Sequence, residues 1–105
     1  MINGDSRANS FTVAGNFSAF NGGVTAINAV EVIGNDNVFN GTVTANQINL
    51  SGNNTSFAGN VSTTNGLNFL NGVTAAMTNG ADITGNVNFG TSDATLRLSD
   101  TSNIN

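Results

Sequence analysis

The first residues that could do chemistry are Gly34-Asn35-Asp36-Asn37, which resemble part of a calcium-binding loop. Calcium needs several convergent oxygen ligands, usually with more than one carboxylate. Asp36 is the only acid in this stretch, and the Gly-Gly-x-Gly-x-Asp nonapeptide of calcium-binding β-rolls is absent from the chain. We therefore interpret Asp36 as a solvated corner residue and predict no metal ion and no cofactor.

Three further acids, Asp82, Asp93 and Asp100, could approach one another in the C-terminal part of the chain. General acid–base catalysis needs carboxylates that are held close together. Pectin-type hydrolases combine such acids with basic residues, and Arg97 is the only basic residue that could serve here. We interpret these acids as scattered surface residues and predict that the chain is not an enzyme. A polysaccharide-processing enzyme is the alternative from a different functional class.

The motif Thr42-Val43-Thr44 has the alternating threonines that ice-binding solenoids repeat on a flat face. Such a face needs the pair in every repeat, and the chain has only the imperfect copies Thr25-Ala26 and Ser62-Thr63. We interpret this motif as ordinary polar surface.

The composition excludes several other classes of protein. The 105 residues include no Cys and no His, which excludes a structural zinc site and a thiol or imidazole nucleophile. Two Arg and no Lys stand against six acids, for a net charge of −4, so a nucleic-acid partner is not expected. No run of 18 apolar residues is present, so we expect no membrane-spanning helix. The length predicts one domain, residues 1–105.

The elements that position these residues form a repeat. The segment VEVIGNDNVFNGTV, residues 30–43, matches INLSGNNTSFAGNV, residues 48–61, at an offset of 18. FTVAGNFSAFNGGV, residues 11–24, matches the first of these at an offset of 19. The three units share the pattern apolar-x-apolar-x-Gly-Asn-x3-Phe-x-Gly-x-Val. Gly and Asn interrupt every apolar run, which disfavours helices, and the apolar-x-apolar pairs have the strand period of two.

A period of 18–19 residues with short strands predicts an all-β fold, a parallel β-solenoid or three-sided β-helix of about five to six rungs. A β-sandwich is the alternative, although a sandwich rarely repeats Gly-Asn and Phe at constant offsets. Inward side chains of successive rungs would stack in four columns. These are Phe11, Val30, Ile48 and Leu67; Val13, Val32, Leu50 and Phe69; Phe20, Phe39 and Phe57; and Val24, Val43 and Val61.

The corners between the strands carry the Gly-Asn pairs. Sharp corners favour left-handed backbone angles, which Gly and Asn tolerate best. Asn side chains can also hydrogen-bond from rung to rung. We therefore predict a corner ladder formed by Gly15 and Asn16, Gly34 and Asn35, and Gly52 and Asn53.

The fourth unit begins at Leu67 and lacks the Gly-Asn corner. FLNGVTA, residues 69–75, resembles AFNGGVTA at 19–26 and VFNGTVTA at 38–45, which predicts a loss of the corner residues. The next unit would then begin at Ala81, at an offset of only 14 from Leu67, and a partial unit would follow at Leu96-Arg97-Leu98. Rungs are therefore expected to become shorter toward the C-terminus.

Neither end of the chain shows a helical or charged cap. An uncapped stack presents unpaired strand edges. We expect the ends to be covered by flanking rungs of a longer chain or by copies of the same chain stacked end to end.

Finally, FTVAGNFSAFNGGVTA and ADITGNVNFG, together with the long segment at 27–66, resemble bacterial autotransporter passenger domains. They are most similar to the passengers of rickettsial outer-membrane surface antigens. The resemblance covers nearly the whole chain and is one of composition and period. It implies a right-handed β-solenoid on the bacterial cell surface, a role in adhesion, and a host-cell receptor as partner.

Overall fold

Short parallel strands separated by polar corners form the fold. The computed structural model describes residues 2, 4–70, 72–90, 93–99 and 101–105. The strands are β1 (Ser6–Val13), β2 (Ala19–Phe20), β3 (Val24–Val32), β4 (Val38–Phe39), β5 (Val43–Leu50), β6 (Thr55–Phe57), β7 (Val61–Phe69), β8 (Thr74–Met77), β9 (Ile83–Thr84), β10 (Val87–Phe89) and β11 (Thr95–Arg97).

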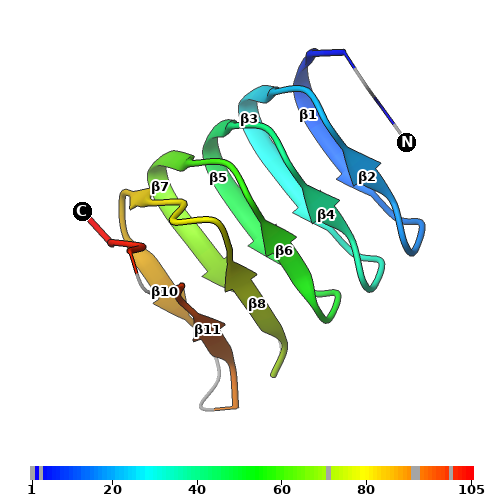
Figure 1. Cartoon of the computed structure of the whole chain (residues 1–105). Helices are drawn as coiled ribbons and strands as arrows, with labels where there is room; N and C mark the ends of the chain where they lie inside the picture. Colours follow the sequence, from blue (N-terminus) through cyan, green and yellow to red (C-terminus); the bar gives the residue numbers. More distant parts are fainter. Residues whose placement is uncertain (1, 3, 71, 91–92, 100) are drawn as a thin grey trace.

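The strands alternate between two sheets, so that the chain winds in a coil (Figure 1). One sheet has the order β1-β3-β5-β7-β10, with β9 also paired to β7, and the other has the order β11-β8-β6-β4-β2. These strand pairs are parallel, because equivalent strands of successive turns run the same way around the axis. The prediction of an all-β parallel solenoid is confirmed, with about five turns.

The longer strands bend and supply two of the three sides. In β3 and β5 the register shifts between Thr25 and Ala29, where the offset changes from 19 (Thr25 to Thr44) to 18 (Ala29 to Gln47). The predicted change in repeat length therefore lies at this bend. Residues before and after the bend form separate sides, and the short strands β2, β4, β6, β8 and β11 form the third.

The later rungs become longer, and the prediction of a shortened unit is wrong. Leu67 pairs with Val87, an offset of 20, and Val61 pairs with Ile83, an offset of 22. Ala81 therefore does not begin a rung above Leu67. Extra residues enter at the turn of Asn79 and Gly80, both of which have positive φ. The final apolar pair also lies elsewhere than expected, because Leu96 pairs with Ala75.

The likeness of residues 69–75 to residues 19–26 does not reflect equivalent positions. Phe69 pairs with Leu50, whereas Phe20 pairs with Phe39. Ala75 lies above Thr55, inside the coil. Residues 69–75 and 19–26 therefore share the sequence Gly-Val-Thr-Ala without being equivalent in the structure, because the shared residues lie on different sides of the coil.

Candidate functional site

The inner columns fill the coil. The column that begins at Phe11 continues through Val30, Ile48 and Leu67 to Val87. The column that begins at Val13 continues through Val32, Leu50 and Phe69 to Phe89. Val24, Val43 and Val61 lie in register and are followed by Ile83 and Ile104. All of these are buried except Phe11, which is half-buried, and the last member of each column, which is half-buried or exposed.

Phe20, Phe39 and Phe57 form a stack of rings through the middle of the third side. The ring centroids of Phe20 and Phe39 lie 4.9 Å apart, and those of Phe39 and Phe57 lie 5.3 Å apart, with interplanar angles of 7° and 16°. A second stack joins Phe69 to Phe89 at 4.9 Å. The separations are close to the spacing of hydrogen-bonded strands, about 4.7–4.9 Å, so strand pairing sets them.

The Asn residues of the corners bond from rung to rung through the backbone. The Oδ1 atom of Asn16 accepts the backbone N–H of Asn35 at 2.7 Å, and the Oδ1 atom of Asn35 accepts that of Asn53 at 2.8 Å. Asn53 continues the series to the backbone N–H of Thr74 at 2.7 Å. The three Asn residues of the corner ladder therefore each satisfy one backbone donor of the following rung.

The glycines of these corners have a different role from the one expected. Gly15, Gly34 and Gly52 do not have positive φ; the left-handed residues of the three corners are Phe17, Asp36 and Asn54, with φ of 57°, 60° and 60°. A Cβ atom on Gly34 would overlap the backbone of Gly15 in the rung below. Close approach between rungs, and not backbone torsion, therefore requires glycine at position 34.

Further Asn ladders were missed by the sequence reasoning. Asn68 donates from Nδ2 to Oδ1 of Asn49 at 2.9 Å, and Asn88 donates to Oδ1 of Asn68 at 2.8 Å. Single links of the same kind join Asn65 to Asn46 and Asn40 to Asn21. The signal was available in the sequence. In each of these four links Asn recurs at an offset of 19 or 20, so a search for Asn at the repeat period would have found them.

A polar column also runs inside the coil beside the phenylalanine stack. Asn37 is fully buried and accepts the backbone N–H of Ser18 on Oδ1 at 2.8 Å. Thr55 lies one rung above and is also buried. Asn37 Nδ2 and Thr55 Oγ1 are buried and have no hydrogen-bond partner among the described residues.

The acids do not form a cluster where the structure describes them. Asp36 accepts the Nδ2 of Asn54 at 3.1 Å. Asp82 accepts the backbone N–H of Asn103 at 2.9 Å, and Asp93 lies beside Gly72 at another corner. Asp100 lies outside the described residues. Within the described chain, no group of three or more acids is placed to hold a metal ion.

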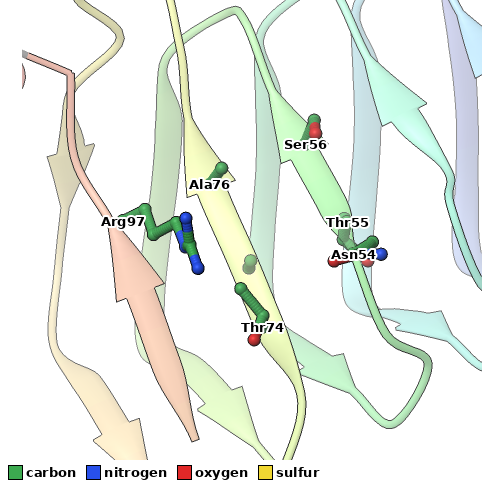
Figure 2. A pocket seen from close by; sticks show the side chains of 7 residues that line it. Asn54, Thr55, Ser56, Thr74, Ala76 and Arg97 are labelled. Carbon is green, nitrogen blue, oxygen red and sulfur yellow. The ribbon is translucent and has the colours of Figure 1, made fainter.

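A shallow hollow of about 320 Å³ lies on the outer face of β6, β8 and β11. Figure 2 shows the side chain of Arg97 extending from β11 toward β8, near Ala76 and Thr74. Asn54 and Ser56 also line the hollow, together with Thr55 and Ala75, whose side chains are buried. No carboxylate is among these lining residues, so the hollow does not pair Arg97 with an acid as a pectin-type hydrolase would need.

The threonine motif gives one row of hydroxyls. Thr25, Thr44, Ser62 and Thr84 lie in register on the outer face of β3, β5, β7 and β9. A second row of threonines, at the position of Thr42, is not formed. Gly23 and Asn60 occupy that position in the adjoining rungs. Thr63, the threonine of the imperfect copy Ser62-Thr63, is buried.

The two ends of the coil expose strand edges and apolar side chains. β1 and β10 are the first and last strands on the path of one sheet, and β2 and β11 are those of the other. The end near the C-terminus exposes Phe89, Leu98 and Ile104, at 51%, 45% and 48%. The opposite end exposes Ile2 at 42%.

No family model, curated protein or solved structure matches the chain. None of the described residues forms a helix with the length and apolar character needed to cross a membrane.

Proposed function

We propose that this chain is a non-enzymatic structural segment, a β-solenoid displayed on the bacterial cell surface as part of an adhesin. The observation that carries the proposal is the continuity of the columns and ladders from rung to rung. They give an unbroken, rigid scaffold whose outer face consists largely of Asn, Thr, Ser and Gly.

The resemblance to autotransporter passengers supports an extracellular location and a host-cell receptor as partner. The absence of Cys is compatible with a scaffold whose stability comes from repeated hydrogen bonds and stacked apolar columns instead of disulfides. The net charge of −4 and the shortage of basic residues disfavour nucleic acid as a partner.

Surface display can be tested on intact cells of the source bacterium. An antibody raised against residues 1–105 should label unpermeabilised cells, and brief protease treatment should remove the label. Labelling that requires permeabilisation would contradict the proposal. Beads coated with the folded chain should also bind cultured host cells more than beads coated with the heat-unfolded chain.

A second role, as a subunit of a fibre, is favoured by the unpaired strand edges and exposed apolar residues at both ends. Edges of this kind are templates for pairing with another chain. In this role the chain would stack end to end on copies of itself.

A further inference from the structure

We infer that the C-terminal end of the coil receives the N-terminal end of a second copy, in a register set by Ile104 and Ser6. This inference rests on the second role, the fibre subunit, and does not depend on surface display. It goes further by naming the two surfaces and their alignment.

A repeated backbone bond defines the register. In each rung, the first residue of one side donates its N–H to a carbonyl of the following rung. The bonds are Ser6 to Gly23, Val24 to Thr42, Val43 to Asn60, Val61 to Asp82 and Ile83 to Asn103, all at 2.8–2.9 Å. Ile104 is the next residue in this column, since it pairs with Ile83. At the opposite end, Asp5 occupies the acceptor position next to Ser6, as Gly23 does next to Val24.

A side-chain ladder at the same corner continues across the same junction. Asp5 Oδ1 accepts the N–H of Gly23 at 2.8 Å, and Asn60 Oδ1 accepts that of Asp82 at 3.0 Å. Asp82 Oδ1 accepts the N–H of Asn103 at 2.9 Å. The carboxamide oxygen of Asn103 is the next acceptor in the series, and the N–H of Asp5 from a second copy is the matching donor.

Apolar contact accompanies these bonds on the neighbouring side. Ile2 pairs with Phe20, so it begins the column of the phenylalanine stack. Leu98 ends that column. The N–H of Thr78 bonds to the carbonyl of Phe57, and Met77, the residue before Thr78, lies above Phe57. The N–H of Ser99 bonds to the carbonyl of Met77 in the same way, which places Leu98 above Met77. Stacking a second copy in this register places Ile2 on Leu98, both of which are exposed in the single chain.

The third side limits the strength of the contact. Val87, Leu98 and Ile104 all belong to the last rung, but the second copy begins with Ile2 and Ser6 and reaches this side only at Phe11, one rung later. The stacked copy therefore leaves a space one strand deep above Phe89, and two sides of three make contact. We expect association that is reversible and dependent on concentration. Because the contact is head to tail and continues the stacking axis of the coil, each added copy extends that axis, and the assembly is an open filament instead of a closed ring.

Sedimentation velocity and negative-stain electron microscopy over a range of concentrations test the inference. The wild-type chain should form linear filaments as concentration rises. The double variant Leu98→Asp/Ile104→Asp should raise the required concentration by about tenfold or more, because each carboxylate would be buried at the junction. Ile33→Asp is the matched control, since Ile33 is 54% exposed on the flank of the coil, and it should leave assembly unchanged. Circular dichroism verifies that each variant is folded.

A cross-link tests the register directly. The chain has no Cys, so the variant Ser6→Cys/Ile104→Cys introduces the only thiols. Neighbouring parallel strands bring paired residues within reach of a disulfide, and these two positions lie at opposite ends of one molecule. Mild oxidation should give a ladder of covalent oligomers, while either single variant should give dimers at most.

The outcomes separate the inference from the role on which it rests. A wild-type chain that stays monomeric at all concentrations would overturn both. Filaments that resist Leu98→Asp/Ile104→Asp, or that yield no cross-linked ladder, would overturn the end-to-end register and leave the fibre role in place.

Discussion

The ring of Phe39 lies almost parallel to that of Phe20 in the rung below, with 4.9 Å between centroids and 7° between planes. Phe57 covers its other face at 5.3 Å, so Phe39 is the central ring of the stack and is 1% exposed. Its environment depends on two neighbouring rungs, each of which could shift only by breaking its strand pairing.

Replacing Phe39 with Ala should therefore cost about 3–5 kcal/mol in the free energy of unfolding, since it removes a buried ring and both stacking partners. Phe39→Leu, which keeps most of the volume, should cost about 1 kcal/mol. Urea unfolding followed by circular dichroism measures both. Phe89→Ala serves as the comparison, because Phe89 stacks on one side only and is exposed on the other. Equal losses at positions 39 and 89 would contradict the dependence on two-sided packing.

The corner ladder predicts a smaller and more selective effect. Asn35→Ala removes the acceptor of the Asn53 N–H and should lower the free energy of unfolding by about 1 kcal/mol. Asn35→Asp keeps an oxygen in the same place and should lose less. Asn28→Ala, at an exposed position of β3, is the control and should change stability little. Hydrogen exchange should speed up at the amide of Asn53 in Asn35→Ala; unchanged protection there would count against the bond.

The close approach of the rungs predicts opposite behaviour for two equivalent glycines. Gly34→Ala places a methyl group against the backbone of Gly15 and should destabilise the chain by about 2 kcal/mol. Gly15→Ala meets only Ser18 Oγ at 3.7 Å, an ordinary contact, and should be tolerated. The difference in urea midpoint between the two variants is the measurement. If both variants were equally harmful, contact with the rung below would not be the reason for glycine at position 34.

A substitution at Phe17 should stabilise the protein. Phe17 has a φ of 57° and is 79% exposed, so its ring gains little from burial while its backbone occupies the left-handed region. Asn tolerates this region, and Phe17→Asn should raise the free energy of unfolding by about 1 kcal/mol. Phe17→Ala also removes the exposed ring but keeps an unfavourable backbone, so it separates the two causes. A gain in thermal midpoint for Ala equal to that for Asn would assign the effect to the ring.

The sequence was sufficient to predict the coil and its register between residues 11 and 69. Phe20, Phe39 and Phe57 recur at offsets of 19 and 18, and the structure places them in one column. Each unit there has three constraints on its alignment. A Gly must be small because the neighbouring rung lies close, an Asn accepts a hydrogen bond from the following rung, and an apolar residue must point inward. Any other alignment would break all three at once.

Beyond residue 69 the register could not be predicted, because the Gly-Asn corner is absent. Val73, Ala75 and Met77 alternate inward as well as any earlier set, so periodicity alone does not fix which rung they join. The position is decided by the space above Phe57, which Met77 fills. The corner ladder is predicted to bond side chain to side chain, whereas in the structure the Oδ1 atom of Asn35 accepts the backbone N–H of Asn53. That choice depends on a side-chain rotamer that residue types do not specify.

The strand-pairing hydrogen bonds of the described residues run along the axis on which the rungs stack, and β1 and β10 lie toward opposite ends of that axis (Figure 1). A tether pulled at both ends would therefore strain only the outermost turn at any moment, and the turns would peel away in sequence instead of shearing together. Each turn, such as the one from Leu67 to Val87, would release roughly 65 Å of slack at about 3.3 Å for each extended residue. Under tension the chain would therefore lengthen in steps of one turn, and it would refold turn by turn when the tension is released.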